Sequence, residues 1–196
     1  MNALNAARAA MLAEAQKPRI GWRRRALMLV VASLGTAGLV ALVAGLAGKD
    51  LEWRVTLIPL LLSGLWLAFV SSRPGHGGLR WAGAGAAVLA SLALVLTRDT
   101  GPESNPANEW LCTVLHVLAA VPAVATALWL LRSMAPSWVR ALCAGLAAGV
   151  TGAVLGELMC GGDAAHVLHY HLTAWTGLTA LVTLVSSRLS RTSWAP

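Results

Sequence analysis

The chain has 196 residues, of which 57% are hydrophobic and 12% are charged, whereas soluble globular domains carry about 25% charged residues. This composition excludes a soluble domain and predicts an all-α integral membrane protein. The formal net charge of +7 does not indicate direct nucleic-acid binding, because the basic residues stand at the ends of apolar runs rather than together on a polar domain.

The chain begins with a polar segment, residues 1–25, that precedes the first apolar run. Residues 2–16 are rich in alanine and leucine and contain no proline or glycine, which favours a short helix. Residues 17–25 form a basic run of the kind that sets membrane topology and contacts anionic lipid. One side of the predicted helix carries a candidate partner-binding surface made of Leu4, Ala7, Met11 and Ala15.

Six apolar runs follow, each near the roughly 20 residues that a helix needs to cross a bilayer. The fifth run reaches that length if it starts at Trp138 and the side chain of Arg140 snorkels to the membrane surface. We therefore predict a six-transmembrane-helix bundle over residues 26–187 and a short tail over residues 188–196. The predicted helices span residues 26–48, 55–72, 79–97, 110–131, 138–159 and 164–187.

Basic residues are unequally divided between the two sides of this predicted bundle. The side with both termini carries 12 of the 15 basic residues, and the other side has only Lys49, Arg54 and Arg98. Seven of the eight acidic residues fall on that other side. The positive-inside rule therefore places both termini in the cytoplasm, and we expect a multi-pass protein of a bacterial inner membrane.

The fifth predicted helix carries glycines at a spacing of three and four residues, at Gly145, Gly149, Gly152 and Gly156. Such a stripe lets a neighbouring backbone approach closely. We expect it to serve helix packing.

Cysteines and histidines gather at the outer ends of the last three predicted helices. Cys112 opens the fourth helix with His116 one turn further on, and Cys160 closes the fifth. The sixth helix begins with His166, His169 and His171. Cys143 lies 17 residues before Cys160, roughly 25 Å along a helix, and is excluded from this group.

Three chemistries suit this Cys/His layer. Thiolate and imidazole together suit zinc or copper, with Glu157 or Asp163 as acceptor for a ligand's remaining ring N–H. Alternatively Cys112 and Cys160 form a disulfide, or His116 and a histidine of the sixth helix ligate haem. The candidate metal ligands are Cys112, His116, Cys160, His166, His169 and His171.

The three histidines of the sixth helix do not all share one direction. In a regular helix His169 and His171 are about 160° apart, whereas His166 and His169 are about 60° apart. The inward pair is therefore predicted to be His166 with either His169 or His171.

The whole arrangement resembles the NrsF-type, CarR-like six-helix membrane anti-sigma factors. The resemblance is carried by Cys112 in NEWLCTVLHVLAAVP, by CAGLAAGVTGAVLGELMC ending at Cys160, and by GGDAAHVLHYH after it. It implies that the protein holds an extracytoplasmic-function sigma factor at the membrane and releases it upon an external signal. Cys112 and Cys160 would then be the sensor pair. The additional histidines depart from the family pattern and favour metal, and residues 1–25 show no clear family signature.

We therefore predict a signalling protein without catalytic activity, an anti-sigma factor whose outer Cys/His layer senses metal, oxidant or a light-generated oxidant. The alternative is a metal- or haem-binding membrane redox protein that uses the same layer, although the chain has no Cys-x-x-Cys pair. A transporter or channel is disfavoured, because the interiors of the six spans are almost free of ionisable groups.

Overall fold

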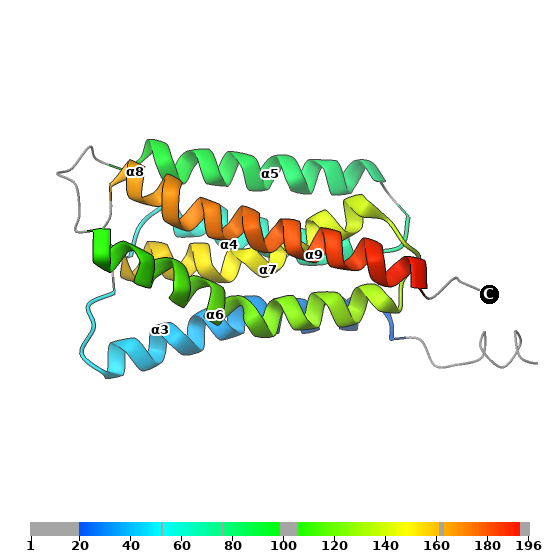
Figure 1. The fold of residues 1–196 in the computed structure, drawn as a ribbon, viewed down its shortest axis with the longest axis horizontal. Helices are drawn as coiled ribbons and strands as arrows, with labels where there is room; N and C mark the ends of the chain where they lie inside the picture. The colour runs from blue at the N-terminus through cyan, green and yellow to red at the C-terminus, as the bar shows by residue number, and fades with distance from the viewer. Residues whose placement is uncertain (1–19, 52, 76, 99–105, 161–162, 193–196) are drawn as a thin grey trace, which may run out of the picture.

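The computed structural model describes residues 20–51, 53–75, 77–98, 106–160 and 163–192. All regular structure in these residues is helical, as the sequence predicts. The helices form an elongated bundle of roughly parallel and antiparallel rods (Figure 1). The predicted partner-binding residues Leu4, Ala7, Met11 and Ala15 lie outside the described residues.

Six rods can be followed in chain order through the described residues. The first is continuous from Trp22 to Leu46, and its middle is a π-helical turn. The last is also interrupted by a π-helical segment, between α8 and α9. The rods are α2 (Trp22–Val30) with η1 (Val31–Gly35) and α3 (Thr36–Leu46), then α4 (Leu57–Ser72), α5 (Gly77–Leu96), α6 (Pro106–Arg132), α7 (Trp138–Met159), and α8 (Ala164–His166) with η2 (Val167–Leu172) and α9 (Thr173–Thr192).

Four of the described rods are long and apolar enough to cross a membrane, in place of the six that the sequence analysis expected. They are Trp22–Leu46, Gly77–Leu96, Trp110–Arg132 and Trp138–Met159. Helix α4 is apolar but has only 16 residues. Helix α9 is rich in threonine and serine and ends in a polar, arginine-containing turn, which lowers its hydropathy.

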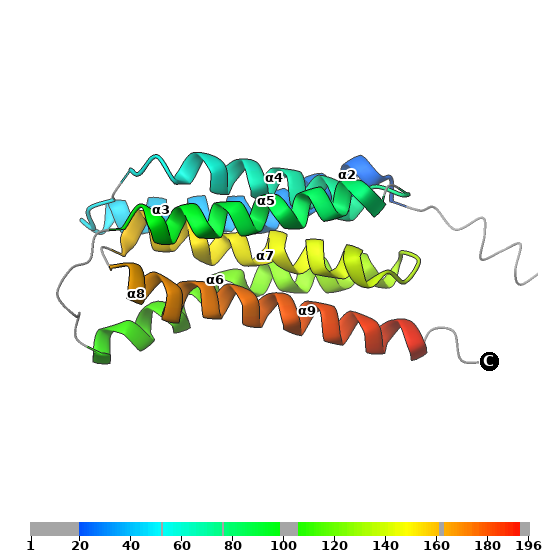
Figure 2. The same cartoon turned by 90° about the horizontal axis from the view of Figure 1, so that it is seen from above.

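Helix α7 is the centre of the bundle. It lies between α4 on one side and α6 and α9 on the other (Figure 2). In its most apolar window 83% of the residues are buried, compared with 22–33% for the other three candidate spans. The outer helices expose large apolar side chains such as Leu39, Leu89 and Leu118. A bundle with a small-residue central helix and an apolar outer surface is what a lipid environment requires.

The glycine stripe allows this central placement. A Cβ atom on Gly145 would lie 2.9 Å from the backbone of Thr179, and one on Gly149 would lie 2.0 Å from the ring of Trp175. Helix α9 therefore packs against bare backbone of α7, as the spacing predicts. The indole of Trp175 uses this proximity to donate a hydrogen bond to the carbonyl of Leu146 at 2.9 Å.

Candidate functional site

The two ends of the bundle carry different chemistry. We call the end where α7 finishes and α8 begins the Cys/His end, after Cys112, Cys160, His166 and His171. The opposite end, where α7 begins, is the arginine end, after its buried Arg80 and Arg140. In Figure 1 the Cys/His end lies on the left and the arginine end on the right.

At the Cys/His end, Cys112 of α6 faces Cys160, the residue that directly follows α7. The Sγ atoms of Cys112 and Cys160 are 3.1 Å apart, and both thiols are free and half-buried. A disulfide has an S–S length of about 2.05 Å, so the two sulfur atoms touch without being bonded. The two cysteines are 48 residues apart in the sequence. They meet because the helices α6 and α7 are antiparallel, so that the start of one lies beside the end of the other.

His166 and His171 complete the cluster from the start of the last rod. Their Nε2 atoms are 3.0 Å apart, and both side chains are buried. In a regular α-helix residues five apart would point about 140° away from each other. Here residues 167–172 form the π-helical segment η2, in which residues five apart stack. The π-helical segment is the reason why His171, rather than His169, joins His166.

One ligand atom from each of Cys112, Cys160, His166 and His171 lies within 4.8 Å of every other. His116 lies just beside this group of four, with its ring centroid 4.4 Å from that of His171. Its side chain is 3% exposed, and its Nδ1 atom has no hydrogen-bond partner among the described residues. His116 thus belongs to the same layer but not to the group of four.

Two of the residues considered from the sequence lie elsewhere. His169 is exposed and its Nδ1 atom bonds the carbonyl of Ala165 at 2.9 Å, so it points away from the cluster. Cys143 is buried near the arginine end, where its Sγ donates to the carbonyl of Arg80 at 3.4 Å. The exclusion of Cys143 from the group agrees with its place on α7.

Space for the histidines is made by two glycines of α7. A Cβ atom on Gly156 would lie 2.3 Å from Nδ1 of His171, and one on Gly152 would lie 3.0 Å from Cβ of His116. Gly152 and Gly156 therefore leave room for the histidines of the Cys/His end. The spacing of the glycines predicted helix packing but not this second role.

A buried ion pair, which the sequence analysis missed, holds the backbone of Cys160. The guanidinium of Arg98 donates to the carboxylate of Glu157, and both side chains are 2% exposed. A second nitrogen of Arg98, Nη1, donates to the carbonyl of Cys160 at 3.2 Å. The hydroxyl of Thr56 donates to the other oxygen of Glu157. The pair thus ties the end of α7 to the residues that flank α4 and α5.

The expectation that Glu157 or Asp163 would accept from a histidine ring needs correction. Glu157 binds Arg98 and Thr56 instead. Asp163 accepts the backbone N–H of His166 at 2.8 Å and caps α8. The sequence did contain a signal for the contact between Glu157 and Arg98. A carboxylate inside the last turn of an apolar helix requires a partner, and Arg98 ends the third apolar run at the same side of the bundle.

The surroundings of Cys160 also affect its ionisation. Burial, together with the adjacent Cys112, raises the pKa of the Cys160 thiol to about 12, whereas Lys49 and Arg98 act in the opposite direction. In the apo protein the thiol therefore stays protonated at neutral pH.

A cavity opens onto both thiols. It has a volume of about 380 Å³ and is bounded by apolar side chains of α6 and α7. Cys112, Cys160, His116 and Lys49 supply its polar groups. Both cysteines therefore border this space.

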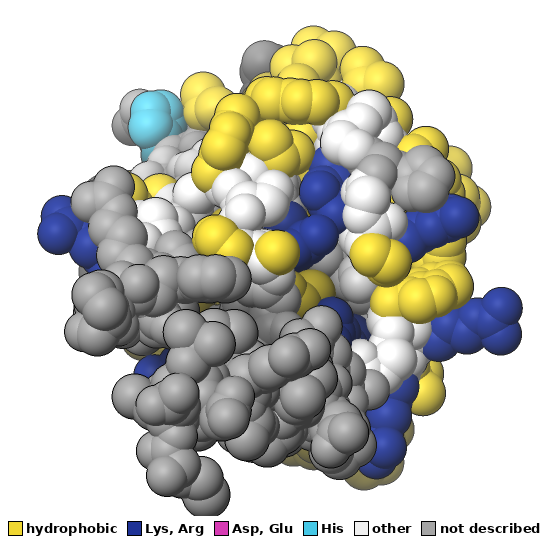
Figure 3. Space-filling view, turned by 90° about the vertical axis from the view of Figure 1, so that its right-hand side faces the viewer, with side chains coloured by type: hydrophobic (Ala, Val, Ile, Leu, Met, Phe, Trp, Pro, Cys, Tyr) yellow, Lys and Arg dark blue, Asp and Glu magenta, His cyan; other side chains and the backbone are white. Residues whose placement is uncertain are grey.

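The arginine end is positively charged. Figure 3 shows Lys and Arg side chains, and no Asp or Glu, among the described residues of this face. Arg80 donates to the carbonyls of Val70 and Arg73, and Arg140 to that of Ala135. Backbone carbonyls at helix ends, rather than carboxylates, therefore hold these two buried guanidinium groups.

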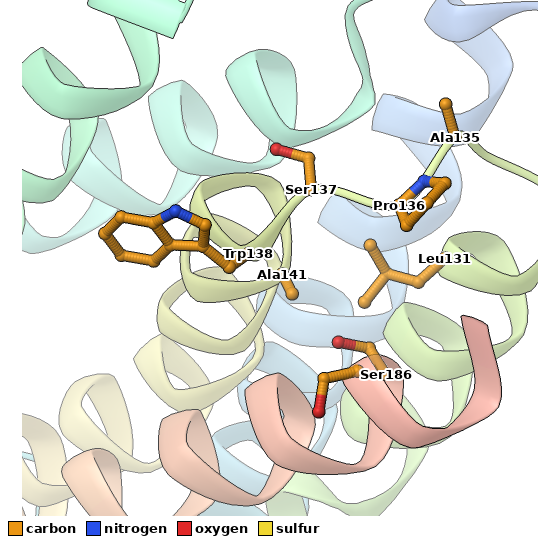
Figure 4. Close-up of a pocket in the computed structure, with 8 residues that line it drawn as sticks. Leu131, Ala135, Pro136, Ser137, Trp138, Ala141 and Ser186 are labelled. Atoms are coloured by element: carbon orange, nitrogen blue, oxygen red, sulfur yellow. The ribbon is translucent and has the colours of Figure 1, made fainter. Parts of the chain in front are cut away.

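A second cavity, of about 300 Å³, lies at this end between the end of α6, the start of α7 and α9 (Figure 4). It is lined by Leu131, Pro136, Trp138 and Ser186, among others. Its lining consists of apolar and hydroxyl groups and contains no titratable side chain, so it offers no acid, base or metal ligand.

Comparisons with known proteins agree with the sequence resemblance. Residues 9–192 match the family described as "Negative regulator of sigma F". The chain is 37% identical over 187 residues to the "Carotenogenesis protein CarR" of Myxococcus xanthus, an alignment that covers 92% of this chain and 84% of that protein. No solved structure matches.

Proposed function

The chain belongs to the NrsF family of negative regulators of sigma F, and from this membership we propose that it is a membrane-bound anti-sigma factor. It sequesters an extracytoplasmic-function sigma factor at the bacterial inner membrane and releases it when the Cys/His end changes state. The family match over residues 9–192 is the observation that carries the proposal. The family description is that of a regulator and not of an enzyme.

The proposed orientation has both termini in the cytoplasm. Two observations support it. Arginines gather at the end of the bundle where the described part of the chain begins and ends, and basic residues favour the cytoplasmic side. The described carboxylates, Asp50, Glu157 and Asp163, all stand at the other end of their helices. The Cys/His end then faces the periplasm, where oxidants and metal ions arrive.

The proposed signal is a change at the thiols of Cys112 and Cys160, caused by metal, oxidant or a light-generated oxidant. Such a signal must favour one of two arrangements of an element that reaches the cytoplasm. Helix α7 meets this need, because it runs from Cys160 to the arginine end and contacts each of the other long rods. Its glycine-lined faces allow sliding or rotation at low steric cost.

Co-purification tests sigma-factor binding. The full-length protein is expressed with the extracytoplasmic-function sigma factor encoded beside it, and the captured sigma factor is measured. We expect capture by the full chain and loss of capture when residues 1–16 are deleted, since this deletion leaves the basic run 17–25 for topology. Absence of capture by the full chain would contradict the proposal.

A matched pair of variants sharpens the same test. Leu4→Glu with Met11→Glu places charges on the proposed binding side of the N-terminal helix. Ala6→Glu with Ala13→Glu places the same charges on the opposite side, about 200° away. We expect only the first pair to lose the sigma factor. If the purified protein instead shows the Soret absorption of haem, the alternative of a membrane redox protein replaces this proposal.

A further inference from the structure

The four converging side chains at the Cys/His end have the composition and spacing of a closed metal site. We propose that Cys112, Cys160, His166 and His171 bind one Zn²⁺ ion, and that a two-electron oxidant expels this ion by joining the two thiols. The assignment of the ion stands on the site geometry, and its regulatory meaning rests on the proposed function.

Distances within the group suit zinc. With Zn–S of about 2.3 Å and Zn–N of about 2.0–2.1 Å, the edges of a tetrahedral site are roughly 3.3–3.8 Å long. The two sulfur atoms are 3.1 Å apart and the two Nε2 atoms 3.0 Å apart, with all four ligand atoms within 4.8 Å of one another. To admit the ion at the centre, the Nε2 pair needs to open by about 0.3 Å and the sulfur pair by about 0.7 Å, while the longest separations in the group shorten.

The donor set suits zinc and excludes the common oxygen-seeking divalent ions. Two thiolates and two imidazoles exclude Mg²⁺ and Ca²⁺, which prefer oxygen ligands. Four protein ligands without an open position are typical of structural zinc. Because the two thiolates neutralise the double charge of the ion, the occupied site is electrically neutral, which a buried site in a membrane protein favours.

The surrounding structure holds the ligands before an ion arrives. The π-helical segment η2 aligns His166 with His171. Gly156 leaves room for the His171 ring, and Arg98 fixes the carbonyl of Cys160. The cavity of about 380 Å³ is bordered by both cysteines.

Zinc and a disulfide exclude each other at this site. When hydrogen peroxide oxidises the pair, each thiolate gives one electron, a sulfur–sulfur bond forms and the O–O bond breaks. The two oxygen atoms leave as water after taking two protons from solvent, and Zn²⁺ departs with its charge unchanged. The ion departs because a disulfide offers no thiolate charge to hold it. From about 3.8 Å apart around the ion, the sulfur atoms must move about 1.7 Å closer to reach the bonding distance of about 2.05 Å.

Metal analysis of the purified full-length protein tests the site. The protein is loaded with Zn²⁺, passed through a desalting column and analysed by mass spectrometry for metal. We expect about one zinc per chain, and loss of this zinc in Cys112→Ser, Cys160→Ser and His171→Asn. Cys143→Ser and His169→Asn are the matched controls and keep the ion, because these side chains lie outside the group. Copper in place of zinc, or zinc lost equally in the controls, would overturn the assignment.

Cobalt substitution covers the case in which a variant fails to fold. Co²⁺ bound to the parent protein should show thiolate-to-cobalt charge transfer and the visible bands of a tetrahedral site. Each single cysteine variant that still melts cooperatively should show weaker charge transfer. A parent spectrum without thiolate bands would contradict the ligand set, whatever the variants do.

Peroxide treatment tests whether the disulfide and the bound zinc exclude each other. A chromogenic chelator measures the zinc that is released, and peptide mass spectrometry measures the Cys112–Cys160 disulfide. We expect the two amounts to rise together. Disulfide formation with the ion retained would refute the second half of the proposal. All three measurements use the protein alone, so they can fail while the sigma factor is still captured, and the reverse also holds.

Discussion

The Cys/His end and the arginine end both bury polar side chains, but they satisfy them in opposite ways. At the Cys/His end a guanidinium meets a carboxylate, Arg98 with Glu157, and thiols meet imidazoles. At the arginine end Arg80 and Arg140 bind only backbone carbonyls within the described structure. The Cys/His end therefore pairs its buried charges, whereas the arginine end keeps a net positive charge.

This difference in how buried polar groups are satisfied gives the two ends of one helix bundle different electrostatic properties. The paired charges and converging thiols and imidazoles of the Cys/His end suit the response to a specific ion or oxidant that we propose for it. Positive charge at the arginine end attracts anionic surfaces, including lipid headgroups. Four substitutions test whether the two ends differ as described, and they are ordered here by expected effect.

The largest effect is expected at the buried ion pair. Glu157→Gln removes the carboxylate that Arg98 meets in the described structure, and removing one partner of a buried ion pair costs about 3–5 kcal/mol. Thermal unfolding in detergent, followed by circular dichroism, measures the loss. The double variant Glu157→Gln with Arg98→Met removes both charges and should recover most of the stability. A single variant as stable as the parent would mean that the two ends do not differ in this respect.

A smaller effect is expected at the arginine end. Arg80→Gln removes hydrogen bonds from a charged donor to the carbonyls of Val70 and Arg73, and such bonds contribute about 1.5–3 kcal/mol. Arg132→Gln, at an exposed position of the same end, is the control and should leave the melting temperature unchanged. Equal losses in the two variants would show that net charge, rather than the buried contacts, stabilises this end.

The third largest loss of stability is expected at Gly156, where α7 packs closely against His171. Gly156→Ala places a Cβ atom 2.3 Å from Nδ1 of His171, and overpacking of this kind costs about 1–3 kcal/mol. It should also lower zinc occupancy, because His171 must move. Gly177→Ala on α9 meets no atom within 4 Å and serves as the control. An unchanged zinc content in Gly156→Ala would place His171 outside the ligand set.

The smallest effect is expected midway between the ends. Thr151→Val removes the hydrogen bond from the buried Thr151 hydroxyl to the carbonyl of Ser33 at 3.1 Å, which links α7 to η1. Hydrogen bonds between membrane helices contribute about 0.6 kcal/mol on average. Thr126→Val, whose hydroxyl bonds its own helix at a half-buried position, should cost less. A loss above that of Arg80→Gln would indicate that the centre of the bundle, and not its ends, dominates stability.

The sequence by itself determined the features that depend on local pattern and composition. Apolar runs predicted the helices, and the stretches between them placed Cys112 and Cys160 at one end and Cys143 at the other. The glycine spacing predicted that α7 would be closely packed. Hydropathy along the chain did not predict that, in the part of the chain that the structure describes, four rods have the length and apolarity of a membrane span. Helix α4 is too short, and α9 contains too many polar residues.

Tertiary structure alone decided which side chains meet at the site. A regular helical period separates His166 from His171, and only the π-helical segment η2 aligns them. Glu157 meets Arg98 and Thr56 across 59 and 101 residues of sequence, which no local period encodes. Helical periodicity is a property of neighbouring residues, whereas the pairing of buried charges and the choice of a π-turn are set by the free energy of the whole packed bundle.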